Sequence, residues 1–523
     1  MSKQDDKPPQ KRGVVSVAAL SPLKRAFDRP ATPRPAAPAK RSRVKPVKKA
    51  GAAKRSEFEG RADSVTKVGA GVPARLEPIK GNPLPRAPRW NSDTPRTPQV
   101  TGASRLEKSL VDLLAEILRF EQAADRSLSV YFKTNSGWGP RERGTLADAT
   151  FDVLRNLSLY KQWATTLEPG GELRRMAILG LRVTDWLPRL SEVEARWLER
   201  VASSDVAELP LQVQASQPDW IFNRLQSQAE KPCEPGALLT GLDLAALCAA
   251  LLKPASFDIR VNTSKTDRQS LISTLALQGI QTSEVADIDT ALEIEGHPSL
   301  ERSEAFRLGL FEVQDRGSQL LTQLCAPKRG QTVVDFCAGA GGKTLAMADQ
   351  MRSTGQVYAC DTSKIRLARL KPRLARSGVS NVQSFAIDSE TDPKLKRLHG
   401  KADLVLVDAP CSGTGTLRRN PDLKWRGSNE ALARLQTLQG KILQSASQLV
   451  KPGGALVYAT CSLLNDENIA IAERFETLNP GFTRAPASEW IPAQFCEGDF
   501  LRLWPHIHGS DGFFGAKWIR TKA

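Results

Sequence analysis

Two cysteines, Cys411 and Cys461, each follow a short hydrophobic run, in the segments DLVLVDAPCSGTG and GALVYATCS. Each segment is typical of a buried strand that ends in a loop, so we expect both thiols at neighbouring strand ends. A free thiol is ionised to only about a few per cent near neutral pH, so a nucleophilic role requires local activation. Lys343 or the amino end of a helix could provide it. The pair predicts covalent chemistry on an electrophilic carbon.

The segment VVDFCAGAGGKT, residues 333–344, predicts a glycine turn between a strand and a helix. Glycines let the backbone turn sharply and approach a ligand closely, while amide groups of the turn open the next helix. In a triphosphate-binding loop the first glycine would fall at position 337, which is Cys337 here. We therefore expect a nucleoside cofactor rather than a nucleoside triphosphate. The residues of the turn are Cys337, Ala338, Gly339, Ala340, Gly341, Gly342 and Lys343.

Three aspartates stand at the carboxyl ends of successive expected strands. Asp361 closes the second strand, Asp388 follows the third and Asp408 ends the fourth. Asp361 comes 22 residues after Gly339, close to the spacing at which an acid accepts hydrogen bonds from ribose hydroxyls. For Asp388 a helix cap or a turn anchor is the plain alternative. Three acids in register predict a ligand crevice at this edge of the sheet.

A strict alternation of strand-like and helical segments must position these residues. The expected strands are TVVDF, GQVYAC, VQSFAI, DLVLVD and ALVYAT, and the expected helices lie near residues 343–351, 363–377 and 430–450. This alternation is typical of a doubly wound parallel sheet. We therefore predict an α/β, Rossmann-like domain over residues 326–523.

The earlier residues divide into three parts by composition. The first hundred hold 23 of the 74 Lys and Arg but only 8 of the 57 Asp and Glu, and 15 of the 34 prolines. Residues 1–103 therefore predict a disordered basic arm that contacts RNA or DNA, with a merely solvated tail as the alternative. Helical periodicity from Ser104 predicts an all-helical domain over residues 104–215. Residues 216–325 predict a proline-marked connector followed by a small α+β subdomain.

Composition also argues against several classes of protein. The eight cysteines include no close CxxC pair and there are only four histidines, so we expect no metal site; Cys496 with His506 and His508 is the nearest approach. No apolar run approaches the roughly 20 residues that cross a bilayer. The start, MSKQDDK, is unlike a secretory signal or a transit peptide. We expect a soluble cytoplasmic protein with reduced thiols, acting without a membrane and as a monomer.

The motifs of the second half, taken together, resemble the Nop/Sun family of RNA cytosine-5 methyltransferases, in particular the bacterial Sun-type enzymes that act on small-subunit rRNA. The matching segments are RVNTSKT (260–266), FEVQDRGSQL (311–320), DFCAGAGGKT (335–344), DAPCSGTGTLRRNPDLKW (408–425), YATCS (458–462), NDEN (465–468) and DGFFGA (511–516). Residues 104–215 also resemble the family's NusB-like RNA-binding domain, through ADRSLSVYF (124–132) and GPRERGTLAD (139–148). The glycine motif departs from the family's usual AAPGGK at Gly339 and Ala340, and we expect cofactor binding to be retained.

The resemblance implies a role for each candidate residue. S-adenosylmethionine would bind along Cys337 to Lys343, with Asp361 at its ribose, Asp388 near its adenine and Asp408 close to the reacting groups. Cys461 would attack carbon 6 of a cytosine in RNA, and Cys411 would assist release of the enzyme from the product. The target base must be single-stranded or extruded, because a stacked base cannot be reached from both faces.

Four residues beside the reactive loop are candidate RNA contacts, with a solvated basic turn as the alternative. They are Arg418, Arg419, Lys424 and Trp425.

Three other functions are weighed against this interpretation. A DNA cytosine-5 methyltransferase would use the cysteine after proline, Cys411, as its nucleophile and would leave Cys461 without a purpose. A non-catalytic RNA-binding assembly factor would need none of Asp408, Cys411 and Cys461. An adenine or small-molecule methyltransferase fits less well, because DAPC stands where a DPPY-type loop is expected. Within the RNA enzymes, tRNA is the alternative to rRNA as the substrate.

Overall fold

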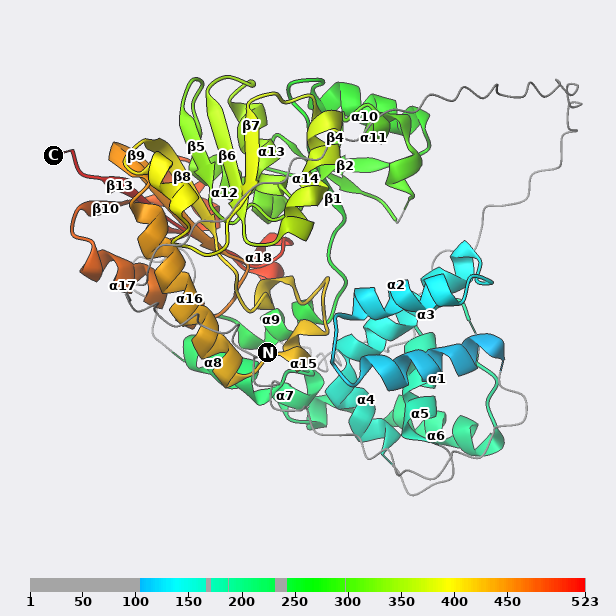
Figure 1. Ribbon diagram of the computed structural model, residues 1–523. Coiled ribbons are helices and arrows are strands. Elements are labelled where there is room, and N and C mark those ends of the chain that lie inside the picture. Colours follow the sequence, from blue (N-terminus) through cyan, green and yellow to red (C-terminus); the bar gives the residue numbers. More distant parts are fainter. Residues whose placement is uncertain (1–103, 166–170, 187, 231–241, 297, 523) are drawn as a thin grey trace, which may run out of the picture. The chain divides into compact units, whose positions relative to one another are not determined.

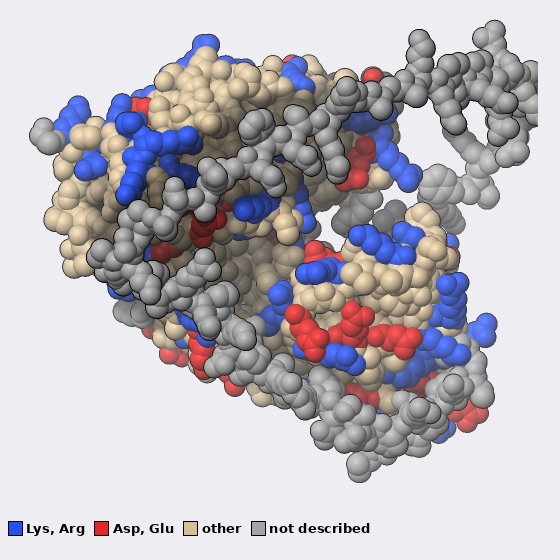
Figure 2. All heavy atoms as spheres, in the orientation of Figure 1, with Lys and Arg blue, Asp and Glu red and all other residues tan. Residues whose placement is uncertain are grey.

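The computed structural model describes residues 104–165, 171–186, 188–230, 242–296 and 298–522. The expected basic arm, residues 1–103, lies outside the described residues. Basic and acidic side chains are interspersed over the face shown in Figure 2, without one large area of a single sign. No helix among the described residues is long and apolar enough to cross a membrane.

The first described part is a bundle of helices (Figure 1). Its helices are α1 (Arg105–Ile117), α2 (Ala124–Thr134), α3 (Pro140–Arg155), α4 (Leu157–Ala164), α5 (Glu172–Leu181) and α6 (Glu192–Ser203). Helix α1 starts at a capping box, in which the Glu107 backbone N–H donates to Ser104 Oγ at 3.3 Å. The leucines that predicted this helix are buried on one face. Helices α3 and α4 are separated at Asn156.

The segment expected to be a connector contains a helix over residues 219–229, which is a correction, whereas the short helices on either side of it lie where helices were expected. After the short turn η1 (Val206–Glu208) come α7 (Leu211–Gln214), α8 (Asp219–Ala229) and α9 (Leu244–Leu251). Prolines favour a connector without helices, but Pro210 and Pro218 stand directly before α7 and α8. Proline is well tolerated at the start of a helix, where its missing N–H costs no hydrogen bond. Ile221 and Leu225 of α8 are fully buried, so this helix belongs to the core.

A small antiparallel sheet precedes the large one. Its strand order is β2-β3-β1-β4, from β1 (Asp258–Val261), β2 (Thr282–Glu284), β3 (Ala291–Ile294) and β4 (Phe311–Val313). The helical turns on it are α10 (Arg268–Leu277), η2 (Leu300–Arg302) and α11 (Glu304–Arg307). The turn after β1 is tied to the large domain by Asp349, which accepts the backbone N–H groups of Thr263 and Ser264 at 3.0 and 2.9 Å.

The large sheet has nine strands and carries the candidate site. Along its main path the order is β11-β12-β13-β9-β8-β5-β6-β7, with β10 paired to β13. The strands are β5 (Thr332–Asp335), β6 (Gln356–Asp361), β7 (Val382–Ala386), β8 (Ala402–Asp408), β9 (Val450–Thr460), β10 (Phe482–Ala485), β11 (Cys496–Glu497), β12 (Phe500–Leu503) and β13 (Phe513–Arg520). Strands β5 to β9 are parallel, and β13 pairs antiparallel with β9. The α/β Rossmann-like prediction is confirmed, but the sheet is mixed rather than wholly parallel.

Helices cover both faces of this sheet (Figure 1). Leu404 and Leu406 of β8 pack with α12 (Arg316–Cys325), α13 (Gly342–Gln350) and α14 (Lys364–Ser377). Val405 and Val407 point to the other face, towards α16 (Asn429–Ser447) and α17 (Ile469–Leu478). Alternate residues of a strand face opposite sides, so a strand buried on both faces is hydrophobic throughout. This double burial explains why the central strands were recognisable as unbroken apolar runs.

Short turns complete the sheet domain. They are η3 (Pro393–Leu398), η4 (Thr414–Thr416), α15 (Leu423–Arg426), η5 (Asn465–Glu467), η6 (Ala487–Glu489), η7 (Ala493–Phe495) and α18 (Pro505–His508).

Candidate active site

The glycine turn between β5 and α13 has the expected conformation. Gly339 and Gly341 have positive φ angles of 56° and 83°. The Gly341 N–H donates to Ala338 O at 2.8 Å, and the Ala338 N–H donates to Cys360 O on the neighbouring strand at 2.9 Å. A Cβ on Gly341 would lie 2.2 Å from Leu370 Cδ1. Only glycine fits this position, because both the angle and the space exclude a side chain.

Gly341→Ala is therefore expected to destabilise the protein by about 2–4 kcal/mol, through left-handed backbone strain and the clash with Leu370. Gly440→Ala is the matched control, since Gly440 lies inside α16 and a Cβ there meets nothing within 4 Å. That change should stabilise the protein by about 0.5–1 kcal/mol, because alanine favours the helix. Urea unfolding of both variants measures the difference. Equal midpoints for the two would contradict this account of the turn.

Asp361 ends β6 directly opposite this turn and is 2 % exposed. Its Oδ2 accepts the Gly339 N–H at 2.8 Å, and its Oδ1 accepts the Ser363 N–H at 2.6 Å. The exposed Arg366 side chain also donates to Oδ1, at 3.1 Å. A carboxylate offers about four acceptor positions, so about one remains on Oδ2. The residues thus fit an adenosine group, with a backbone turn for close approach and an acceptor for a ribose hydroxyl.

Asp388 and Asp408 lie at the same edge of the sheet. Asp388 is exposed in the loop after β7, and its backbone N–H donates to Asp392 Oδ2 at 2.8 Å. Asp408 ends β8, and its Oδ2 accepts a hydrogen bond from Lys343 Nζ at 2.7 Å. Burial acts against the charged form of Lys343, but the adjacent Asp408 carboxylate outweighs it and raises the pKa of the ammonium group. Lys343 is therefore a fixed positive charge beside the crevice.

The two cysteines meet at the end of the sheet. Cys411 follows β8, Cys461 follows β9, and their sulfur atoms are 3.4 Å apart. A hydrogen bond connects the two loops, since the Gly415 N–H donates to Cys461 O at 2.9 Å. The loop before β13 packs against them, since the Gly512 N–H donates to Gly415 O at 2.9 Å. The predicted convergence of two thiols from separate loops is what the structure contains.

The charges around the two sulfur atoms differ. The hydrogen bond with Cys461 raises the pKa of the Cys411 thiol well above its ordinary value, and burial and the Glu467 carboxylate add to this. Cys461 is close enough to Lys343 that its thiolate form helps to raise the pKa of that ammonium. A cation thus lies on the side of Cys461, and the Glu467 carboxylate opposes ionisation of Cys411.

A 3.4 Å contact between sulfur atoms predicts that mild oxidation joins them. A disulfide requires about 2.05 Å between the sulfurs and compatible Cβ positions, which small loop movements can supply. Treatment with diamide should remove two thiols per chain, and peptide mass spectrometry should find Cys411 linked to Cys461. The buried Cys325 and Cys360 should stay unmodified under the same conditions. Linkage of either sulfur to another cysteine instead would contradict the arrangement.

Three buried acids were not singled out from the sequence. Asp335 ends β5, accepts the Thr344 hydroxyl at 2.6 Å, and has its pKa raised to about 7 by burial. Glu467 follows the second cysteine and is fully buried. Asp511 accepts Arg419 Nε at 2.7 Å, and burial raises its pKa to about 7. All three stand inside the motif segments quoted above, so position in a motif was the available signal.

The candidate RNA contacts beside the reactive loop are mostly occupied within the protein, which corrects that interpretation. Lys424 is 2 % exposed and donates to Arg155 O at 2.8 Å, and burial lowers its pKa to about 7. Trp425 Nε1 donates to Leu154 O at 2.8 Å. Arg418 donates to three carbonyl oxygens, and Arg419 pairs with Asp315 and Asp511. The sequence of a basic turn does not show whether its cations are buried.

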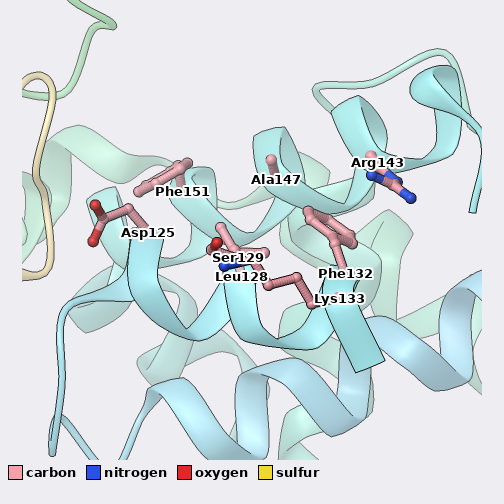
Figure 3. A pocket seen from close by; sticks show the side chains of 8 residues that line it. All are labelled: Asp125, Leu128, Ser129, Phe132, Lys133, Arg143, Ala147 and Phe151. Atoms are coloured by element: carbon pink, nitrogen blue, oxygen red, sulfur yellow. The ribbon is translucent and has the colours of Figure 1, made fainter. Parts of the chain in front are cut away.

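A separate hollow of about 450 Å³ lies between α2 and α3, away from the cysteines (Figure 3). Phe132, Phe151, Leu128 and Ala147 form its apolar lining, and Arg143 lies with its guanidinium 5.6 Å from the centre of the Phe132 ring. Among the described residues no group of three or more His, Cys, Asp or Glu side chains could hold a metal ion.

Comparison with known proteins adds the following. Residues 322–519 match the family described as 16S rRNA methyltransferase RsmB/F, and residues 239–301 match a ferredoxin-like domain of RsmF/B-like methyltransferases. A probable ribosomal RNA small subunit methyltransferase B from Synechocystis is 34% identical over 59% of this chain and 68% of its own length. A mouse 28S rRNA (cytosine-C(5))-methyltransferase is 32% identical over 50% of this chain and 35% of its own.

A solved structure of a methyltransferase homologue from Pyrococcus horikoshii is also similar. It shares 28% identity and a TM-score of 0.51, over 61% of this chain and all of that chain.

Proposed function

The chain belongs to the Nop/Sun family of S-adenosylmethionine-dependent RNA cytosine-5 methyltransferases, and from this premise we propose that it methylates a cytosine of small-subunit (16S) rRNA through a covalent adduct of Cys461. The observation that carries the proposal is the 3.4 Å contact between the sulfur atoms of Cys411 and Cys461 beside the Asp408–Lys343 ion pair. We also propose that it acts in the cytoplasm as a monomer.

The proposed reaction divides the work between the two thiols. Carbon 5 of cytosine is a poor nucleophile until a covalent bond at carbon 6 breaks the conjugation of the ring. The Cys461 thiolate forms that bond, and S-adenosylmethionine supplies the methyl group to carbon 5. The carbon 5 proton is then lost to a base, and its bonding electrons re-form the double bond between carbons 5 and 6 while Cys461 leaves as a thiolate. Cys411 assists this release. The positive Lys343 near Cys461 and the negative Glu467 near Cys411 support the division.

The remaining candidate residues are proposed to bind the cofactor and to orient the reacting groups. We propose that the turn Cys337–Lys343 receives the cofactor, that Asp361 accepts its ribose hydroxyls and that Asp388 lies at its adenine. Asp408 orients the reacting groups while it holds Lys343 charged at 2.7 Å. These roles rest on the family resemblance and on the position of all three acids at one edge of the sheet.

The domains before the sheet are proposed to hold RNA. The helical part, residues 104–215, is proposed to be the NusB-like domain, and residues 216–325 with the small sheet to form an RNA-binding subdomain. The hollow between α2 and α3 supports this, since it joins an aromatic ring with the cations Arg143 and Lys133. Aromatic faces beside cations are a common way to bind unpaired bases. The basic arm would add affinity through contacts with phosphates.

Purified protein with S-adenosylmethionine should place 5-methylcytosine at one position of unmodified 16S rRNA, read by bisulfite sequencing. Deletion of the gene should remove the same methyl group in cells. Methylation of tRNA but not 16S rRNA would overturn the substrate assignment. No methylation of any RNA, together with no binding of S-adenosylmethionine by calorimetry, would favour a non-catalytic assembly factor instead.

A further inference from the structure

The residue after each reactive cysteine is a serine, and the two serines meet. Ser412 Oγ and Ser462 Oγ are 3.3 Å apart, and Thr414 Oγ1 lies 3.1 Å from Ser462 Oγ. The Leu463 N–H also donates to Thr414 Oγ1 at 2.9 Å. These three hydroxyl groups, here called the hydroxyl cluster, join the loop of Cys411 to the loop of Cys461. The separation of the two sulfur atoms therefore depends on this cluster.

Glu467 anchors the hydroxyl cluster. One carboxylate oxygen accepts the Ser412 N–H at 2.9 Å, and the other accepts the Ser412 hydroxyl at 2.5 Å. Gln439 Nε2 of α16 donates both to Glu467 Oε1 and to Pro410 O, each at 2.9 Å. Both backbone neighbours of Cys411 are thus held by one group of side chains. Glu467 fixes the loop that carries this thiol.

The carboxylate is fully buried, and no Lys or Arg within the described part of the chain forms an ion pair with it. A buried charge without a counterion is costly unless hydrogen bonds compensate it, and here Ser412 and Gln439 donate those hydrogen bonds. The charged or titratable groups near Cys411 are Cys461 just after β9, Tyr458 on β9, Glu467 on η5, and the Asp408–Lys343 pair. Glu467 brings a negative charge to the side of Cys411, whereas Lys343 brings a positive charge to the side of Cys461.

We propose that Glu467 is a positioning residue that sets the separation of the two thiols through Ser412 and Ser462 and brings a negative charge to the side of Cys411. The inference rests on the proposed function, because it concerns which of the two cysteines becomes the nucleophile. Glu467 itself touches neither substrate nor cofactor in this scheme. It acts through Ser412 and through its charge.

The test is the pH dependence of alkylation of each cysteine by iodoacetamide, followed by peptide mass spectrometry, in full-length protein without RNA or cofactor. Glu467→Gln keeps the shape and an acceptor oxygen but removes the charge, so the Cys411 midpoint should fall. Asp466→Asn is the matched control, since Asp466 is the adjacent acid but pairs with Arg224 at 3.1 Å. Glu467→Asp, which keeps the charge, should restore most of the shift.

Ser462→Ala gives a second readout if the Glu467 variants fold poorly. It leaves the Glu467 charge in place but opens the hydroxyl cluster, so diamide should join Cys411 to Cys461 several-fold more slowly, and the Cys411 midpoint should fall as the hydrogen bond with Cys461 weakens. A merely structural role would lower thermal stability without moving either value. An unchanged Cys411 midpoint in folded Glu467→Gln, or an equal shift in Asp466→Asn, would overturn the inference. The alkylation needs no RNA, so a wild-type protein that fails to methylate would count against the proposed function alone.

Discussion

Cys461→Ser is expected to abolish methyl transfer to 16S rRNA, by roughly 10⁴-fold or more. A serine hydroxyl has no appreciable alkoxide form near neutral pH, even beside the cation of Lys343. Transfer of radioactive methyl groups from S-adenosylmethionine to unmodified rRNA measures the loss. Binding of the cofactor should be unchanged, because the substituted side chain lies on the substrate side of the proposed site. Cys496→Ser, in β11, is a control thiol that should retain activity.

Cys411→Ser should behave differently, since adduct formation needs only Cys461. Protein and RNA should accumulate as a covalent complex, visible as a shifted band under denaturing conditions. Adding Cys461→Ser to this variant should remove the band. If Cys411→Ser alone prevented the complex and Cys461→Ser allowed it, the two roles would have to be exchanged, as in the DNA cytosine-5 enzymes.

Asp408→Asn should have the second largest effect, lowering kcat/KM for methyl transfer by about 10²–10³-fold. The change removes the counterion of Lys343 and an acceptor at the end of β8. Asp403→Asn is the matched control, because Asp403 lies at the other end of the same strand and pairs with the surface residue Lys451. Steady-state kinetics with rRNA as the varied substrate separate the two. Equal kinetics for both variants would show that the Asp408–Lys343 pair has no part in the reaction.

The pH dependence of the stability of the wild-type protein should reflect the Asp408–Lys343 ion pair. Asp408 raises the pKa of Lys343 above its ordinary value, near 10.4 for a free side chain. The contribution of the pair is therefore fully present at neutral pH and is lost only when the pH rises through the raised pKa of the folded state. In Asp408→Asn, the largest influence that raises the pKa of Lys343 is lost while burial still lowers it, so stability should decline at a lower pH than in the wild type. Chemical denaturation between pH 7 and strongly alkaline pH tests the order of the two profiles.

The parallel strands were predictable because each is buried on both faces and therefore reads as an unbroken apolar run. The same runs placed Cys411, Cys461, Asp361 and Asp408 at one edge, since the carboxyl ends of parallel strands meet there. The antiparallel addition of β13 was not predictable, because strand direction in the sheet depends on pairing between distant segments. The helix α8 was not predictable from the prolines, because Pro218 also marks turns, whereas here it stands just before the first turn of the helix.

Side-chain burial was the other property that could not be predicted from the sequence. Lys424 looks like a surface cation in the sequence, and only tertiary packing against Arg155 shows that it is enclosed. The motif that contains Glu467 does not show that this residue is buried. A carboxylate that holds a neighbouring loop by hydrogen bonds cannot be told from a solvent-exposed one by local sequence. Both depend on contacts across more than fifty residues, which no local pattern contains.

The contacts of Lys424 and Trp425 with the carbonyl groups of Arg155 and Leu154 have an evolutionary consequence. The segment that begins at Cys411 ends with these two side chains packed against the helical bundle. We therefore expect that the bundle cannot be replaced without also changing this segment. A homologue that lost the helices would expose an indole and free an ammonium that is now enclosed. We expect shorter relatives to carry compensating polar residues at these two positions, and chimaeras that swap the bundle alone to inherit a misfitted reactive loop.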